Sequence, residues 1–525
     1  MADKTGGEGL EIELKFELDE ADARKVLRSP ALRALQSGRP RARTLRATYF
    51  DTPDFQLFAR KLALRVRREG GRHVQCLKAS GPSDGGGAGG FSRREWEWTV
   101  PGPDLDAALL RADADIRKLM KGVDWRALGP VYGTDIQRHG RTLTLADGAV
   151  VACDWDRGVV TAGEAKEPLC ELELELETGG VDALLEIGRL VAATVPARLS
   201  RRTKAGRGQA LFLGGGAGWA TAQKLALPKD ALGEDVLRAA LLEGLHQVMA
   251  NEDCVLQRCH VEGVHQMRVA LRRMRSLIST FRKLLPAGTS EALAVALRDA
   301  GAALGPARDW DVFVDETLVV LEEAFPGDPA LAELRVRAQR SRDAAYEQAR
   351  RMIRSQDHAR LSMDVLCWAV EGGWRGAAPV TWRGVGLESP ARDVARAILA
   401  KRHGGLLKAG KSPESLTAMQ RHELRISVKK MRYASEFMSS LYVGKAVKRY
   451  VGALKALQED LGRQNDWVTA ERLIGELASA SKGASAASLD RVRGMVEGWR
   501  AHAFQSCDAD FLAAWERFRK ASPYW

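Results

Sequence analysis

The sequence predicts an α+β multidomain protein, in which an N-terminal antiparallel β-barrel with flanking helices precedes an all-helical domain. Before residue 213 the apolar residues repeat mainly with a period of two, which is typical of half-buried strands. After residue 228 they repeat with the helical period of about 3.6. A stretch of 46 residues that begins at His265 recurs 157 residues later without a gap, which predicts two copies of one helical unit.

The N-terminal region contains alternating or β-rich runs separated by turn residues. We expect strands near residues 9–17, 44–50, 62–68, 73–79, 91–99, 141–157 and 168–178. Short helices are expected near residues 19–28 and 181–194. An antiparallel sheet of about eight strands is large enough to close into a barrel. The glycine-rich segment 81–90 lies between two strand patterns, so we interpret it as a hairpin insertion.

Glycine-rich and aperiodic segments mark the expected domain boundaries. Gly214–Gly218 is a flexible run between the last strand-like segment and a helix that begins near Pro228. Residues 371–389 contain Gly, Trp and Pro without periodicity and are interpreted as the connection between the helical repeats. The predicted organisation is a barrel domain at 1–213, a linker at 214–227 and a helical domain at 228–525, with repeats at about 228–372 and 390–525.

Composition limits the class of protein. The chain has 525 residues, 45% of them hydrophobic and 28% charged, which fits two or three globular domains. No apolar run reaches about 18 residues and no charged-then-apolar leader is present, so we expect neither a membrane span nor a secretory signal. The seven cysteines are scattered without a C-x-x-C pair. We therefore expect reduced packing cysteines in a cytoplasmic protein.

Charged side chains alternate along three of the predicted strands. Residues two apart on a strand point to the same face, so each array is one-sided. A solvated edge strand is one interpretation of such an array. Acidic and basic faces in one sheet fit the interior of a barrel better, where charges must be paired or matched by a ligand. The arrays are Glu11, Glu13 and Lys15; Arg65 and Arg67; and Glu171, Glu173, Glu175 and Glu177.

A ligand that matches both kinds of charge is a metal-bound polyanion. Carboxylate oxygens bind hard divalent cations such as Mg²⁺ or Mn²⁺. Arg and Lys side chains bind phosphate oxygens. A chain of phosphates with bound metal would engage both sets. Neither a Walker-type phosphate loop nor a zinc-binding spacing occurs in the sequence, so phosphate would be held in another way.

Each helical repeat carries a row of cations along one arc of an amphipathic helix. Between Arg268 and Lys283 there is no acidic residue, whereas a row built only for solubility would mix Glu with Lys. A solvated surface remains an alternative for the rows, and capping or packing remains one for their histidines. Two such rows predict an extended anionic ligand. The rows are His265, Arg268, Arg272 and Arg275, and His422, Arg425, Lys429 and Arg432.

The two rows also belong to a repeated motif. H-x-x-R-x-x-x-[RK]-[RK]-x-R followed by L-G-x-x-x-D-W occurs in each repeat and resembles the CHAD domain, a helical module of two internal repeats. The resemblance implies that the basic faces bind inorganic polyphosphate. We interpret Asp309 and Asp466 of the D-W elements as structural helix caps. The residues implicated in binding are His265, Arg268, Arg272, Arg273 and Arg275 in the first copy, and His422, Arg425, Lys429, Lys430 and Arg432 in the second.

The N-terminal charges resemble those of a second family. Glu11, Glu13 and Lys15 form an E-x-E-x-K start. Further matches follow in order through residues 9–213, and together they resemble the CYTH, or triphosphate tunnel metalloenzyme, family. The matches include Tyr49-Phe50-Asp51-Thr52, Leu64-Arg65-Val66-Arg67, Leu77-Lys78, Arg138, Asp156-Arg157-Gly158, the acidic run from Glu171 to Glu177, and Lys204 with Arg207-Gly208.

This second resemblance implies an eight-stranded tunnel that hydrolyses or cyclises triphosphate groups with a divalent metal. It implies that Asp156 positions the metal or the attacking water, with Asp154 as a competitor on the same face. The implied metal ligands are Glu11, Glu13, Glu171, Glu173 and Glu175. The implied phosphate-binding residues are Lys15, Arg65, Arg67, Lys78, Arg138, Lys204 and Arg207.

The tandem order resembles bacterial CYTH–CHAD proteins, several of which act on inorganic triphosphate. We therefore expect a cytoplasmic hydrolase of inorganic triphosphate that depends on Mg²⁺ or Mn²⁺ and binds polyphosphate through its helical domain. Alternatives are a thiamine triphosphatase, a nucleotide cyclase, or a non-catalytic polyphosphate-binding protein associated with granules. A net charge of +12 is compatible with nucleic-acid binding, but the basic rows lack the interleaved aromatics that stack on bases. Substrate length, oligomeric state and protein partners stay open.

Overall fold

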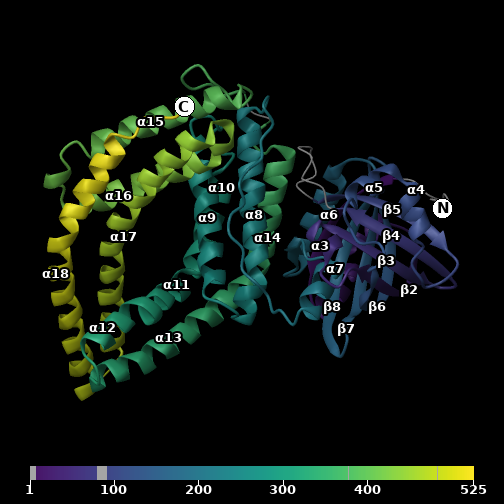
Figure 1. Ribbon diagram of the computed structural model, residues 1–525, viewed down its shortest axis with the longest axis horizontal. Coiled ribbons are helices and arrows are strands. Elements are labelled where there is room, and N and C mark those ends of the chain that lie inside the picture. Colours follow the sequence, from purple (N-terminus) through teal and green to yellow (C-terminus); the bar gives the residue numbers. More distant parts are fainter. Residues whose placement is uncertain (1–7, 80–90, 376–377, 482) are drawn as a thin grey trace. The chain divides into compact units, whose positions relative to one another are not determined.

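The computed structural model describes residues 8–79, 91–375, 378–481 and 483–525. The chain forms two compact units. The first, the barrel unit, comprises Met1–Gly218 and Ile353–Glu371. The second, the helical unit, comprises Trp219–Met352 and Gly372–Trp525 (Figure 1). The predicted boundaries differ from this division, because they assigned 353–371 to the first helical repeat.

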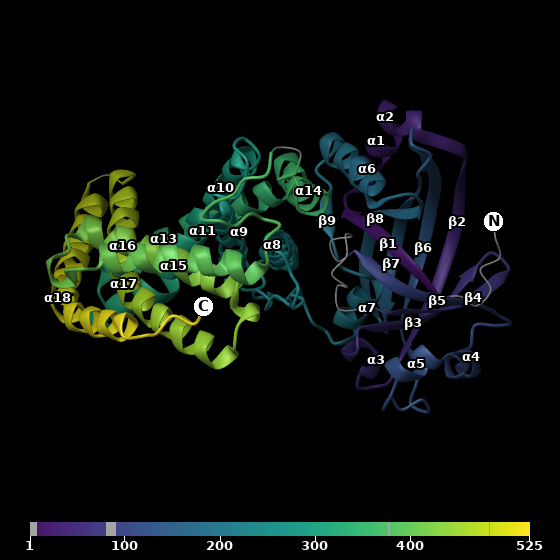
Figure 2. The ribbon, with the colours of Figure 1, turned by 90° about the horizontal axis from the view of Figure 1, so that it is seen from above.

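The barrel unit is built around a closed antiparallel barrel of eight strands (Figure 2). Strand β1 closes the barrel, because its first half pairs with β5 and its second half pairs with β8. A short strand, β9 (Arg198–Ser200), adds to β1. The predicted barrel is thus confirmed. Its strands are β1 (Glu8–Glu17), β2 (Gln36–Asp51), β3 (Leu62–Glu69), β4 (Arg72–Ala79), β5 (Ser92–Val100), β6 (Gly129–Thr144), β7 (Val150–Ala162) and β8 (Ala165–Thr178).

One predicted strand is in fact a hairpin of two strands. The run near 141–157 divides into the end of β6 and the start of β7, with a tight turn between them. In that turn the Asp147 carboxylate accepts a hydrogen bond from the Ala149 N–H at 3.0 Å. A turn this short leaves the period of two nearly undisturbed, which is why the two strands look continuous in the sequence. The hairpin insertion expected at 81–90 lies outside the described residues.

Helices from two distant parts of the sequence pack on the barrel. The predicted helices near 19–28 and 181–194 are α1 (Glu20–Arg28) and α6 (Val181–Thr194). Helix α14 (Gln356–Glu371) packs against α6 and β9, and its buried Met363 lies against Gly188 of α6. The remaining helices of this unit are α2 (Pro30–Leu35), α3 (Gln56–Ala59), α4 (Ala107–Ala112), α5 (Ala114–Leu119) and α7 (Lys204–Phe212).

Helix α7 lies against strands β6, β7 and β8. Its N-cap is Thr203, whose hydroxyl accepts a hydrogen bond from the Gly206 N–H at 2.9 Å. Gly208 allows the close approach, since a Cβ atom there would lie 2.1 Å from the ring of Tyr132. With the helix fixed in this way, Lys204 is directed into the barrel and is only 8% exposed.

The helical unit contains two copies of one arrangement of helices. Helix α8 corresponds to α15 and α9 to α16, at the offset that the sequence repeat predicts. No helix within the described ranges is both long and apolar enough to cross a membrane. The helices are α8 (Gly233–Gln257), α9 (Glu262–Phe281), α10 (Glu291–Ala303), α11 (Gly305–Val312), α12 (Leu318–Ala324), α13 (Pro329–Ile353), α15 (Ala391–Ala409), α16 (Ala418–Phe437), α17 (Gly444–Ser479) and α18 (Ala484–Arg519).

The copies differ at the Leu-Gly motif. In the first copy the chain breaks at Leu304, between α10 and α11, whereas in the second copy α17 runs through the corresponding position. Asp309 lies inside α11 and does not cap it, so the expected capping role is wrong. Its carboxylate instead pairs with Arg472 of α17 at 2.9 Å. The side chain of Asp466 lies outside the described residues.

Two of the cysteines form a disulfide, between Cys254 and Cys259. Helix α8 ends at Arg258 in the left-handed conformation, with φ of 55°, and this reversal brings the two thiols together. The expectation that the cysteines are reduced packing residues is therefore wrong for this pair. Cys76, Cys153, Cys170 and Cys367 are free thiols.

Candidate active site and basic helical face

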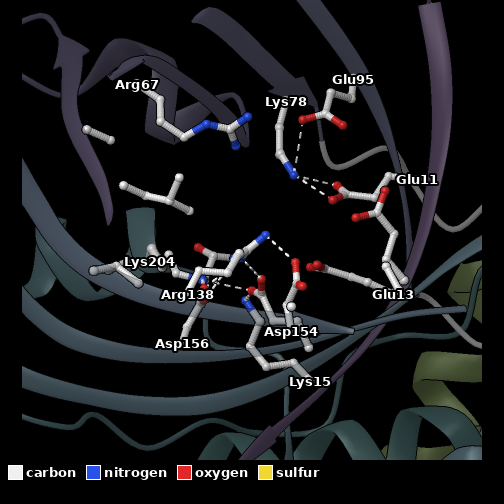
Figure 3. Close-up of a pocket in the computed structure, with 18 of the residues that line it drawn as sticks. Glu11, Glu13, Lys15, Arg67, Lys78, Glu95, Arg138, Asp154, Asp156 and Lys204 are labelled. Carbon is white, nitrogen blue, oxygen red and sulfur yellow. Dashed lines mark hydrogen bonds and ion pairs between the residues drawn. The ribbon is translucent and has the colours of Figure 1, made fainter. Parts of the chain in front are cut away.

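The interior of the barrel holds a cavity of about 900 Å³, here called the barrel cavity, which is lined from all eight strands and from α7. Because side chains alternate along a strand, the odd-numbered residues of β1, β3, β5 and β8 face inward. Most of these residues are charged. Figure 3 shows carboxylates and cations projecting toward one another from opposite walls of the cavity.

Five buried charges meet at one wall of the cavity and form what we call the inner cluster. The Lys204 ammonium lies 2.8 Å from a carboxylate oxygen of Asp156 and 2.8 Å from one of Glu173. Lys15 also lies 2.8 Å from Glu173. Glu171, which is fully buried, contacts both lysines. The cluster therefore contains three carboxylates and two ammonium groups.

Arg138 extends this cluster to both candidate aspartates. Its guanidinium donates two hydrogen bonds to Asp156, at 2.7 and 2.6 Å, and lies 2.6 Å from Asp154. Burial would raise the pKa of Asp156, but Lys204 and Arg138 outweigh burial and lower it. The pKa of Asp154 is raised, chiefly by burial. The surroundings therefore favour the charged form at Asp156 more than at Asp154.

A second group of charges lies on β1, β4, β5 and β8. The Lys78 ammonium binds both carboxylate oxygens of Glu11, at 2.6 and 2.7 Å, and lies 3.2 Å from Glu95. Arg93 lies 3.2 Å from Glu13. Glu175 is the register partner of Glu13 on the neighbouring strand, and burial and Glu11 raise its pKa to about 7. A carboxylate with this pKa is poorly compensated by its surroundings.

The structure brings most of the residues predicted for the N-terminal site together. The two predicted residues that do not line the cavity are Glu171 and Arg207. Glu171 lies behind the lysines of the inner cluster, and Arg207 pairs with Glu17 and Glu167. The predicted residues that line the cavity are Glu11, Glu13, Lys15, Arg65, Arg67, Lys78, Arg138, Asp156, Glu173, Glu175 and Lys204.

Sequence reasoning missed two further arrays that line the cavity. Strand β5 contributes Arg93, Glu95 and Glu97, and the N-terminal half of β2 contributes arginines. Both arrays alternate as the E-x-E-x-K start does, so the same period of two could have identified them. In the β5 array Glu95 and Glu97 alternate with Trp96 and Trp98, which point to the other face of the strand. The arginines of β2 are Arg39, Arg41 and Arg43.

In the helical unit, α9 and α16 pack against each other and carry the two predicted rows of cations. The Arg272 guanidinium donates a hydrogen bond to the Tyr433 hydroxyl at 3.0 Å. Arg273 is only 9% exposed, pairs with Glu436 of α16, and lies 5.1 Å from the ring centroid of Phe437. The geometry thus places Arg273 in the contact between the two helices.

The other predicted cations form what we call the basic face. Arg275, His422 and Lys430 are exposed, and the rest are half-buried. Burial, Arg308 and neighbouring arginines lower the pKa of His265 to about 4, so this imidazole is neutral at pH 7. The basic face consists of His265, Arg268, Arg272, Arg275, His422, Arg425, Lys429, Lys430 and Arg432.

Both units match known protein families. The CYTH domain model matches residues 9–208, and the CHAD domain model matches residues 239–475. The inorganic triphosphatase of Haemophilus influenzae is 25% identical over 170 residues. That match spans 31% of this chain and 45% of the relative's length.

Two solved structures resemble part of the chain. The crystal structure of the CHAD domain from the plant Ricinus communis is 32% identical, with a TM-score of 0.50, and the match covers 57% of this chain and 96% of that chain. PptA from Streptomyces chartreusis is 18% identical, with a TM-score of 0.42, and the match covers 55% and 100% of the two chains. The chain therefore belongs to the CHAD-domain family and, with its N-terminal CYTH domain, is a CYTH–CHAD tandem protein.

Proposed function

We propose that the barrel unit hydrolyses inorganic triphosphate with the help of a divalent cation. The observation that supports this most directly is the barrel cavity, where cations suited to phosphate oxygens and carboxylates suited to a hard metal line one enclosed space. The partial match to an inorganic triphosphatase supports the choice of triphosphate among phosphate compounds.

The donor set of the cavity fits Mg²⁺ or Mn²⁺. Oxygen atoms of Asp156, Glu171 and Glu173 come within 4.8 Å of one another, and Glu13 lies beside Glu175. Burial, and then Glu11, raises the pKa of Glu175 to about 7, and a bound cation would favour its charged form. We propose that Glu11, Glu13, Glu173 and Glu175 hold the metal, with Glu171 behind them. A bound divalent metal would supply charge neutralisation of the phosphates and a more acidic water.

The cations would bind and orient the phosphate chain. Lys15, Lys204 and Arg138 already contact several carboxylates each, so a phosphate oxygen would replace or share these partners. Arg65, Arg67 and Lys78 face them from β3 and β4. These groups would stabilise the charge that spreads over the non-bridging oxygens during cleavage of the phosphoanhydride bond. Asp156, kept ionised by Arg138 and Lys204, would accept a hydrogen bond from the attacking water.

We further propose that the basic face binds inorganic polyphosphate. The support is its cationic composition over two packed helices, since neighbouring cations attract a polyanion. Thiamine triphosphate and nucleoside triphosphates remain the competing substrates for the barrel cavity.

Phosphate release by the purified full-length protein tests the enzymatic proposal. The panel would contain triphosphate, ATP, thiamine triphosphate and long-chain polyphosphate, each with Mg²⁺, with Mn²⁺ and with EDTA. We expect release from triphosphate that requires metal, and its loss in Glu13→Gln. Metal-independent release, or a preference for ATP or thiamine triphosphate, would contradict the proposal.

A further inference from the structure

Strands β2, β6, β7 and β8, which form one wall of the barrel, are longer than strands β3, β4 and β5. Strand β3 pairs with β2 only over residues 45–50, whereas β6 pairs with β2 over its whole length, from Gln36 to Asp51. The N-terminal half of β2 therefore projects beyond β3 as the edge of a wall formed by β2, β6, β7 and β8. Figure 2 shows β2 and β6 as long strands of the barrel unit.

Three arginines lie on this projecting edge and line the cavity: Arg39, Arg41 and Arg43, here called the arginine edge. Arg41 and Arg43 alternate in step with Leu45, so they share its inward face. A bulge follows Ser37, and Arg39 lies within it. From Arg39 to Arg43 an extended chain spans about 13 Å.

The arginine edge is continuous with the inner cluster. Arg43 is the register partner of Arg138, the residue that binds both aspartates. Two residues before Arg43 on the same strand, Arg41 is the register partner of Gly140. A Cβ atom at Gly140 would lie 2.6 Å from a carboxylate oxygen of Asp154. This glycine lets Asp154 lie across β6 next to β2. A path of cationic side chains thus leads from the proposed cleavage site outward along β2.

The charge balance changes along this path. In the inner cluster each cation contacts two or more carboxylates. On the arginine edge Arg43 pairs with Glu69, and all three arginines are exposed to solvent. Exposed guanidinium groups are accessible to an anion, and their planar shape suits phosphate oxygens.

We propose that the arginine edge is a subsite for the distal phosphates of linear polyphosphates longer than triphosphate. This inference rests on the proposed function, since it assumes that the terminal phosphates lie at the inner cluster. The substrate class of the barrel unit then includes chains of four or more phosphates, which leave the cavity past Arg43, Arg41 and Arg39.

The test compares substrates that differ by one phosphate. We would measure kcat/KM for triphosphate and tetraphosphate with the full-length wild type, with Arg39→Ser/Arg41→Ser, and with Arg46→Ser. Arg46 is the matched control, because it lies on the same strand, is exposed, and pairs with Asp135 at 3.0 Å. We expect the ratio of tetraphosphate to triphosphate kcat/KM to fall about tenfold in the double variant and to stay unchanged in the control.

A binding measurement separates this inference from the proposed activity. In EDTA, tetraphosphate should raise the melting temperature of the wild type more than triphosphate does, and the double variant should lose that difference. If the wild type releases no phosphate with any metal, the proposed function fails and the melting comparison still decides the subsite. Equal losses for both substrates, or a double variant that behaves like Arg46→Ser, would overturn the subsite and leave the arginines as protection of an edge strand.

Discussion

The barrel cavity and the basic face differ in how their positive charges are paired with carboxylates. In the cavity, several lysines and arginines form ion pairs with carboxylates of other strands. On the basic face the cations lie beside one another on two packed helices, and Glu436 is the carboxylate that pairs with Arg432. A buried set must be balanced even without ligand, whereas a surface set can keep an excess of charge in water. A ligand of the cavity must therefore match fixed positions of both kinds of charge, whereas a ligand of the basic face needs only negative charge.

The largest effect should follow from removing one cation of the balanced set. Lys204→Met leaves Asp156, Glu171 and Glu173 without their shared ammonium group. We expect triphosphate hydrolysis to fall by about a hundredfold or more, and the free energy of unfolding to fall by about 3–5 kcal/mol. Phosphate release and urea denaturation would measure both, with exposed Lys166→Met on β8 as the control. A variant with unchanged stability would show that the charges are not balanced in this way.

Glu175 is a cavity carboxylate with a raised pKa, so its removal should have the opposite effect on stability. Its pKa is about 7 in the folded protein and near 4.5 when unfolded, so the folded state binds more protons between these values. Without metal, wild-type stability should therefore fall as the pH rises from about 4.5 to 7, by at most about 3 kcal/mol.

Glu175→Gln should be free of that loss, and in EDTA at pH 8 it should melt above the wild type while binding metal more weakly. Metal affinity of the wild type should also fall below pH 7, where protons compete for Glu175. Melting curves at several pH values and metal titrations would measure this. A variant that is less stable than wild type at pH 8 would contradict it.

On the basic face, charge reversal should affect binding and leave stability nearly unchanged. Arg275→Glu/Lys430→Glu changes two exposed positions, one on each helix. We expect affinity for long-chain polyphosphate to fall about tenfold or more, with a shallower dependence on salt, because fewer counterions are released, as for nucleic acids. Lys445→Glu, at an exposed position of α17, is the control. Binding isotherms at several salt concentrations would test it, and an unchanged salt slope would argue against the basic face.

Replacing Arg273 should change polyphosphate binding least, although Arg273 occupies a position of the CHAD motif that the resemblance assigns to binding. Because Arg273 pairs with Glu436 between α9 and α16, Arg273→Met should lower the melting temperature and change polyphosphate affinity by less than about twofold. Arg275→Met, two positions along, should do the reverse. Parallel melting and binding measurements on these two variants would show whether sequence motif or burial decides the role.

Most of the cavity could be predicted because strand alternation is a local property. Glu11, Glu13 and Lys15 face one side of any strand that they occupy, and the barrel places that side inward. Alternation could not show which cation meets which carboxylate, since those pairs join residues far apart in the chain. Glu171 has the right period yet lies behind Lys204, because α7 inserts that lysine in front of it. Those contacts depend on tertiary packing alone.

On the helices, periodicity correctly gave an amphipathic pattern but not the extent of burial. Arg273 sits at the edge of the polar arc, and only the packing of α16 decides that it is covered. The capping role expected of Asp309 failed for a related reason, since the helix begins at Gly305 and the carboxylate meets Arg472 from the other copy.

The position of helix α14 in the sequence determines when the barrel unit can finish folding during translation. The barrel strands leave the ribosome first, but the helix that packs on α6 and β9 is synthesised only after α8 to α13. Until then the apolar surface of α6 that meets Met363 has no partner from its own chain, and exposed surface of that kind recruits chaperones or aggregates. The first unit to be translated is thus not the first to be finished. A fragment that stops at the glycine-rich linker would keep every strand and remain permanently at that unfinished stage.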